Sequence, residues 1–194
     1  MRGIKQWLDS HSNVKTFLHG LLIHPVECRP RLWLRLLRPF YTHCALSSKI
    51  YSSARMDVVP FHLFCLGKRS VIESFSCVNN AVGDVIVGDN SRIGLHNTII
   101  GPVQIGCNVI IAQGVVASGL NHGFCNPDQT IESQPVTTSP IVIEDDVWIG
   151  ANAVITAGVH IGRHVIIGAG SIVTHDIPDH SLAVGCPAKV VRSI

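Results

Sequence analysis

The chain has 194 residues, of which 46% are hydrophobic and only 6% are aromatic. That length allows one domain with an appended segment, and the shortage of large rings favours a thin core rather than a broad globular one. Charged residues make up 14% of the chain, which is low for a monomer and predicts surface buried between subunits. We expect neither a signal peptide nor a membrane-spanning helix, which needs roughly 18 apolar residues in a row.

The charge and the cysteines add two further expectations. Residues 1–55 carry nine Lys/Arg against two Asp/Glu, a net charge of +7, whereas residues 56–194 carry six against eleven, a net charge of −5. The seven cysteines are scattered without a Cys-x-x-Cys pair. We therefore expect reduced thiols in a cytoplasmic protein rather than disulfides or a metal site.

Residues 1–56 predict an N-terminal helical segment. Apolar side chains recur at helical spacing from Trp7 to Leu22, and two prolines then break the pattern. A second helical stretch over residues 31–38 carries Arg31, Arg35 and Arg38 on one side. It is either a basic amphipathic helix for an anionic membrane surface or a helix that packs its Leu/Trp face on the solenoid or a neighbouring subunit.

Residues 57–180 are dominated by a six-residue repeat. This period is neither the 3.6 of an α-helix nor the 2.0 of a strand, and it is typical of a parallel β-helix built from hexapeptides. The sequence thus predicts an all-β solenoid in which one small apolar side chain per hexapeptide points into a shared core. The predicted core positions are Val87, Ile93, Ile99, Ile105, Ile111, Ala117, Ile143, Ile149, Ile155, Ile161, Ile167 and Val173.

The repeat breaks once, between Ala117 and Ile143. These residues are 26 positions apart, which is not a multiple of six, so the chain must leave the solenoid as a protruding loop over residues 118–140. Long loops on rigid scaffolds usually carry function. Of the eleven histidines only His122 lies in this loop. The repeat ends near Pro178, and residues 181–194 form a C-terminal tail.

Several motifs resemble the hexapeptide-repeat acyltransferases, and among them the sugar O-acetyltransferases, such as galactoside, maltose and polysaccharide-biosynthesis acetyltransferases. The resemblance covers roughly residues 60–192, whereas the first 55 residues depart from the family's short helical start and leave the acceptor open. It rests on Val147-Trp148-Ile149-Gly150-Ala151-Asn152, Gly168-Ala169-Gly170-Ser171-Ile172-Val173-Thr174, Gly185-Cys186-Pro187-Ala188-Lys189-Val190, Asn121-His122-Gly123-Phe124 and Ser139-Pro140-Ile141-Val142-Ile143.

The resemblance implies a left-handed helix, against the usual right-handed crossover. It also implies a homotrimer with active sites between subunits, acetyl-CoA as acyl donor, a sugar or saccharide acceptor, and no nucleic-acid partner. In this reading His122 is the general base that takes the proton of the acceptor hydroxyl, since imidazole titrates near neutral pH.

The same resemblance implies further site residues. For each of them the alternative is an ordinary solenoid or tail residue without a role in the site. Asn97 either stabilises an oxyanion or stacks inside the solenoid. Trp148 contacts CoA or a neighbouring subunit, and small residues allow the pantetheine arm to approach the backbone closely. The implied CoA contacts are Trp148, Ala151, Ala169, Thr174, His175, Lys189 and Arg192.

Alternative functions remain. The same chemistry could serve serine or the amine of an amino-sugar nucleotide. A γ-carbonic anhydrase-like zinc enzyme needs three histidines; His160 and His164 fall at different places in their hexapeptides and are expected to point in different directions, so we expect no metal. An inactive solenoid that serves as an assembly scaffold is the last alternative.

Overall fold

The computed structural model describes residues 14, 17, 20–24, 26 and 29–194, and the chain divides into two compact units, residues 1–41 and 42–194. In the first unit β1 (Ile23–His24) pairs antiparallel with β2 (Arg29–Pro30). The helix α3 (Leu32–Leu36) and the 3-10 helix η1 (Arg38–Phe40) follow. Among the described residues no helix is long and apolar enough to cross a membrane.

The predicted N-terminal helices are therefore confirmed only in part. The stretch over residues 31–38 is a single helical turn that gives way to η1, which carries Pro39 near its start. Proline suits the first turn of a helix and cannot continue a preceding one. Residues 14, 17 and 20–22 are helical, and the rest of the pattern from Trp7 onward lies outside the described residues.

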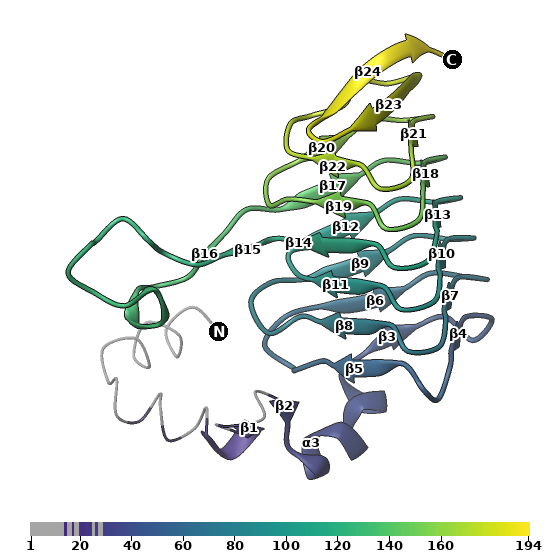
Figure 1. Cartoon of the computed structure of the whole chain (residues 1–194). Coiled ribbons are helices and arrows are strands. Elements are labelled where there is room, and N and C mark those ends of the chain that lie inside the picture. Colours follow the sequence, from purple (N-terminus) through teal and green to yellow (C-terminus); the bar gives the residue numbers. More distant parts are fainter. Residues whose placement is uncertain (1–13, 15–16, 18–19, 25, 27–28) are drawn as a thin grey trace, which may run out of the picture. The chain divides into compact units, whose positions relative to one another are not determined.

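The second unit is a solenoid whose three faces are parallel sheets (Figure 1). Face 1 contains β3 (His43–Cys44), β6 (Phe64–Leu66), β9 (Val85–Val87), β12 (Val103–Ile105), β17 (Ile141–Ile143) and β20 (His160–Ile161). Face 2 contains β4 (Lys49–Ile50), β7 (Val71–Ile72), β10 (Arg92–Ile93), β13 (Ile110–Ile111), β18 (Trp148–Ile149), β21 (Ile166–Ile167), β23 (Ser181–Gly185) and β24 (Ala188–Ser193). Face 3 contains β5 (Arg55–Asp57), β8 (Cys77–Asn79), β11 (Thr98–Ile100), β14 (Val116–Ser118), β19 (Val154–Ile155) and β22 (Ile172–Val173).

The core confirms the six-residue repeat. All twelve predicted positions from Val87 to Val173 are buried, with at most 2% of each side chain exposed. Ile93 pairs with Ile111, and Ile149 pairs with Ile167, so like side chains stack on like from coil to coil. Each buried Ile or Val contributes roughly 1.5–3 kcal/mol to folding as an upper estimate.

The solenoid is a left-handed β-helix, as the resemblance implies. At the corner between faces 1 and 2 the same turn position has a positive φ of 53° to 59° in coil after coil. This left-handed backbone favours Gly, Asn and Asp, and the column contains both asparagine and aspartate. Its members are Arg69, Asn90, Asn108, Asp146, His164 and His180.

Both ends of the solenoid extend the predicted architecture. The first coil begins at β3, whereas the repeat in the sequence placed the start of the domain at residue 57. Leu46 and Cys44 are exposed there, so this coil lacks the buried Ile/Val period that reveals the later ones. The C-terminal tail is a hairpin in which β23 joins face 2 beside β21 and β24 pairs antiparallel with β23.

Candidate functional site

The predicted loop leaves the solenoid after β14 and returns at β17. Its stem is a two-stranded antiparallel ribbon of β15 (Leu120–Asn121) and β16 (Thr137–Thr138), with the 3-10 helix η2 (Ile131–Ser133) between them. Figure 1 shows the loop standing away from the coils, on the side opposite β18 and β21. His122 is the first residue after β15 and its side chain is exposed.

A buried glutamine holds the loop together around His122. Gln134 accepts a hydrogen bond from the Asn126 N–H at 3.0 Å and donates to the carbonyl oxygens of Asn126 at 3.0 Å and Gln129 at 3.3 Å. Beside His122, a Cβ on Gly123 would lie 2.6 Å from the Pro135 carbonyl oxygen. A glycine is therefore required where the two arms of the loop meet.

No described residue forms a hydrogen bond or an ion pair with the His122 ring. A general base usually has a second group that orients its ring and a neighbouring site for the reacting atom. Within the described part of a single chain, the exposed His122 ring therefore has no neighbouring group that would complete a catalytic site.

Asn97 lies inside the solenoid rather than at its surface. Its side chain is fully buried, and its Oδ1 accepts a hydrogen bond from the Val115 N–H at 2.6 Å. Because an oxyanion-stabilising group must reach the reacting carbonyl, this geometry favours the internal-stacking interpretation over the catalytic one.

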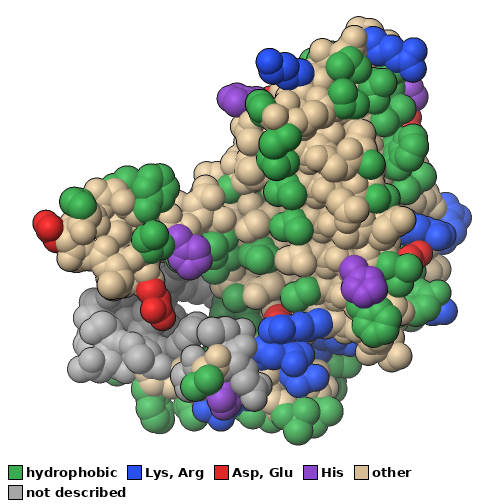
Figure 2. Space-filling view, in the orientation of Figure 1, with side chains coloured by type: hydrophobic (Ala, Val, Ile, Leu, Met, Phe, Trp, Pro, Cys, Tyr) green, Lys and Arg blue, Asp and Glu red, His purple; other side chains and the backbone are tan. Residues whose placement is uncertain are grey.

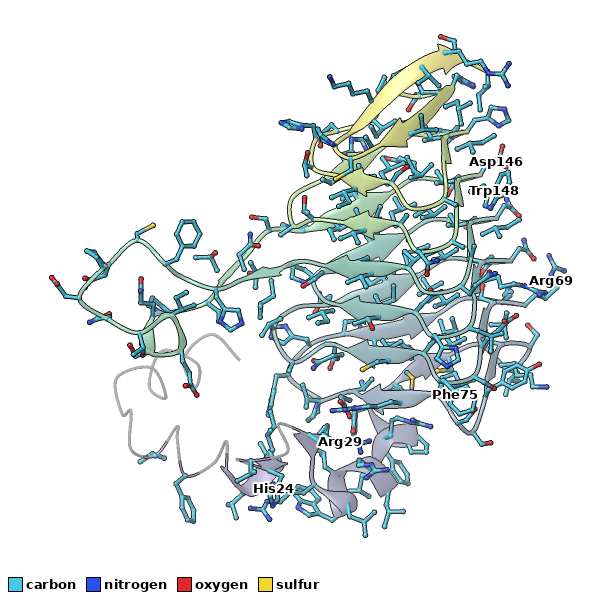
Figure 3. All side chains as sticks on the ribbon, viewed as in Figure 1. His24, Arg29, Arg69, Phe75, Asp146 and Trp148 are labelled. Atoms are coloured by element: carbon cyan, nitrogen blue, oxygen red, sulfur yellow. The ribbon has the colours of Figure 1, made fainter. Side chains whose placement is uncertain are left out.

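Trp148 projects outward from face 2. Its side chain is 51% exposed and borders a shallow hollow of about 190 Å³, together with Ile110, Ile166 and Ile194. Figure 3 labels Trp148 beside Asp146 at this edge, and Figure 2 shows hydrophobic side chains along the same side of the solenoid. The side chain points outward, as the sequence predicts, and its contact with a cofactor or a neighbouring subunit stays a prediction.

The other predicted CoA contacts lie at three places. Ala151 and Ala169 occupy the same corner between faces 2 and 3 one coil apart, and the Gly170 N–H donates to the Ala151 carbonyl at 2.8 Å. Thr174 and His175 lie across face 3 at the next corner, where Thr174 Oγ1 is 2.9 Å from His175 Nδ1. Lys189 and Arg192 lie on β24 at the end of face 2.

At the corner between faces 2 and 3, the sequence did not predict one pair of residues. Phe75 and His96 are exposed, both have left-handed backbone with φ of 61° and 58°, and their rings stack with centroids 5.1 Å apart. They occupy the turn position that Gly114 and Gly170 take in later coils. A phenylalanine at a left-handed turn position, which Gly114, Asn152 and Gly170 occupy in later coils, was the available signal. The corner thus changes from aromatic in the early coils to glycine or asparagine in the later ones.

His160 and His164 bind different carboxylates. His160 Nε2 lies 3.0 Å from Glu144 Oε1, and His164 Nδ1 lies 2.6 Å from Asp146 Oδ2. The first histidine is on face 1 and the second is at the corner that follows it. Among the described residues, no group of three His, Cys, Asp or Glu side chains is arranged to hold a metal ion.

Comparison with known proteins supports the family. The profile described as "Hexapeptide repeat of succinyl-transferase" matches residues 84–117 and 140–175. Galactoside O-acetyltransferase of Escherichia coli is 39% identical over 113 residues, which are 57% of this chain and 55% of that protein. A tetrahydropyridine-dicarboxylate N-acetyltransferase of Staphylococcus aureus is 42% identical over 87 residues, 45% of this chain and 31% of that protein. The chain thus spans about half or less of the length of these curated relatives.

Solved structures share the architecture. A variant of AntD, an N-acyltransferase from Bacillus cereus in complex with dTDP-4-amino-4,6-dideoxyglucose and Coenzyme A, superimposes with a TM-score of 0.69 at 21% identity over 82% of this chain and 88% of that one. A maltose O-acetyltransferase from Clostridium difficile 630 has a TM-score of 0.57 at 27% identity, covering 82% and 73%. Residues 84–117 and 140–175 therefore carry hexapeptide repeats of this kind, and the chain shares its left-handed coils with acyltransferases of known structure.

Proposed function

We propose that this protein transfers an acetyl group from acetyl-CoA to a hydroxyl of a sugar or saccharide. The observation that carries the proposal is His122, an exposed histidine held on a loop that interrupts the repeat. It would accept the proton of the acceptor hydroxyl while that oxygen attacks the thioester carbonyl. The resulting imidazolium would return the proton to the departing CoA thiolate, so no covalent intermediate on the protein is required.

We also propose that the site forms between subunits of a homotrimer. The loop leaves the solenoid at the corner between faces 3 and 1, whereas Trp148, Ala151 and Ala169 lie on face 2 or at its corner with face 3 (Figure 1). In addition, no described residue of the same chain orients the His122 ring. A loop that reaches a neighbour's small-residue corner would supply both missing parts of the site.

The CoA moiety would lie along that corner. Ala151 and Ala169 leave the backbone open to a pantetheine arm, and Trp148 offers an exposed ring beside it. Lys189 and Arg192 on β24, with Thr174 and His175 across face 3, would serve the phosphates. A cytoplasmic location is part of the proposal, and reduced thiols at Cys65, Cys107, Cys125 and Cys186 are compatible with it.

An amine acceptor is the second candidate, because the relative from Staphylococcus aureus is an N-acetyltransferase that is 42% identical over 87 residues. An amino-sugar nucleotide would use the same base and the same donor. The two candidates differ in the acceptor atom, so a mixed panel of acceptors distinguishes them.

The test is a CoA-thiol release assay over galactosides, maltose, nucleotide sugars, amino-sugar nucleotides and serine. We expect release with a sugar hydroxyl, and a loss of at least about 100-fold in His122→Ala, because general-base catalysis contributes 100- to 10,000-fold. His43→Ala, an exposed histidine on β3, is the matched control and should keep its rate.

Other outcomes would contradict the proposal. A loss in His122→Ala below about tenfold would overturn the assigned base. If none of the acceptors in the panel gives CoA-thiol release, the result would favour a scaffold without activity. Stoichiometric zinc by metal analysis would favour a γ-carbonic anhydrase-like enzyme.

A further inference from the structure

The segment from Arg29 to Phe40 exposes most of its large apolar side chains. In α3 and η1 only Leu34 is buried, at 3% exposure, whereas Leu32 is 66%, Leu36 71% and Phe40 85% exposed. Trp33 and Leu37 are close to half exposed. Soluble proteins rarely leave an apolar cluster of this size uncovered, and such a cluster marks a contact surface.

Hydrogen bonds within the first unit hold this orientation. The Tyr41 hydroxyl donates to the Leu34 carbonyl at 3.0 Å, which ties the buried side of the helix to the residues that follow it. Arg31 Nε donates to the Gly20 carbonyl at 2.8 Å and anchors the start of the helix. With Leu34 turned inward on one helical turn, the other apolar side chains cannot all be buried with it.

Arginines alternate with these apolar side chains. Residues 29–41 contain four arginines and no Asp or Glu, and residues 1–41 carry seven Lys/Arg against two Asp/Glu. Arg31 and Arg35 line a hollow of about 500 Å³ together with Trp33 and Leu36. The Arg35 side chain forms no hydrogen bond or ion pair with another described residue. Figure 3 labels Arg29 and His24 on the hairpin that precedes the helix.

We propose that this surface, residues 29–40, binds the anionic face of a phospholipid bilayer. Leucine, tryptophan and phenylalanine side chains would enter the boundary between head groups and acyl chains. The arginine stems would follow them, with each guanidinium at the level of the lipid phosphates. A bilayer offers apolar depth and negative charge over one continuous surface, which matches the mixed character of residues 29–40. No spanning helix is needed for this peripheral contact.

The arginine charges and the apolar side chains should each affect binding in a measurable way. Each cation near an anionic bilayer strengthens binding by about fivefold, and this contribution weakens as salt shortens the range of electrostatic attraction. The apolar contribution should persist at high salt. Binding should therefore require negative lipid and also respond to single apolar substitutions.

The experiment is co-sedimentation of the full chain with vesicles of pure phosphatidylcholine and of phosphatidylcholine mixed with phosphatidylglycerol. We expect binding only to the mixed vesicles, and at least about tenfold weaker binding for Arg35→Glu. Lys68→Glu makes the same change of charge on the solenoid and should bind within about twofold of the wild type. Leu36→Ser should also weaken binding, whereas Leu46→Ser, at a leucine 108% exposed in the second unit, should not.

Three results would overturn the proposal. One is no sedimentation with the mixed vesicles, and another is equal weakening by the matched controls. The third is a change of oligomeric mass in lipid-free Leu36→Ser, measured by light scattering, which would assign the surface to contact between copies of the chain. The proposal does not depend on the acetyltransferase activity, because vesicle binding needs neither acetyl-CoA nor an acceptor.

Discussion

Asn97 is a buried amide at an inner corner position that the hydroxyl residue Ser76 occupies in the preceding coil. The Ser76 Oγ donates to the Gly94 carbonyl at 2.6 Å and accepts the Asn97 N–H at 3.1 Å, so both of its capacities are used. Asn97 accepts the Val115 N–H in the same way, but its buried Nδ2 has no hydrogen-bond partner among the described residues. A buried donor without a partner costs about 1–3 kcal/mol.

Asn97→Ser should therefore raise the free energy of unfolding by about 1 kcal/mol, since a hydroxyl can accept one hydrogen bond and donate another. Denaturant unfolding measures this change, and acetyl transfer should stay within about threefold of the wild-type rate. Asn97→Ala removes the acceptor of the Val115 N–H and should destabilise the protein. If the Asn97→Ser variant is stable but inactive, the result would support the oxyanion-stabilising interpretation of Asn97.

Burial also separates the cysteines by reactivity. Burial raises the pKa of the Cys65 thiol, and the neighbouring Cys44 and Asp84 raise this pKa further. A raised pKa leaves less thiolate at neutral pH. Cys65 should react more slowly with iodoacetamide than the exposed Cys125, as peptide mass spectrometry can follow; a faster reaction at Cys65 would contradict the assigned environment.

At the scale of elements, the loop over residues 118–140 is attached to the solenoid at its two ends and cross-linked by Gln134. The ribbon of β15 and β16 pairs only Leu120 with Thr138 and Asn121 with Thr137. Beyond this ribbon, the Gln134 side chain bonds residues Asn126 and Gln129 across the loop. The loop beyond the ribbon is thus cross-linked by a single buried side chain.

Gln134→Ala should loosen the loop while leaving the coils intact. We expect faster proteolysis within residues 119–140, lower transfer activity, and little change in the melting temperature, because the loop contributes little to the stacked core. Gln113→Ala, at an exposed glutamine on a solenoid corner, is the control. Unchanged proteolysis in Gln134→Ala would contradict this role.

The sequence predicts some elements far better than others, for physical reasons. Each core isoleucine is visible because every coil repeats the same environment, so Ile93, Ile111 and Ile149 report one constraint. The coil that begins at His43 was not predicted, because its core positions are Cys44, Ile50 and Met56, of which only Met56 is buried. Asn97 satisfied the repeat and the family pattern equally well, and only the direction of its side chain separates the two interpretations. The Phe75–His96 stack needed coordinates, because residues 21 positions apart meet only after coiling.

At the scale of the whole molecule, stability should vary along the axis of the solenoid. Strands in the middle pair on both sides, as β13 does with β10 and β18, whereas β4 pairs only with β7 and β22 only with β19. Solenoids behave as a row of repeats held by contacts between nearest neighbours. The two ends should therefore open at lower free energy than the middle.

Hydrogen exchange of the full chain measures this difference directly. Backbone amides of β10, β13 and β18 should exchange most slowly, and those of β4, β5 and β22 faster. Uniform protection along the axis would show that the second unit unfolds as one block and not from its ends.

The ladder of face 2 also records how much chain the loop adds. Ile110 pairs with Trp148, 38 positions later, whereas Trp148 pairs with Ile166, 18 positions later, and the difference is 20 residues. The coils before and after the loop therefore keep the same strand register on face 2. A deletion of 20 residues from the loop should leave the stacking of the coils unchanged. A loop of another length or sequence should be accepted at the same place. The solenoid and the loop over residues 118–140 are therefore separable parts of this chain.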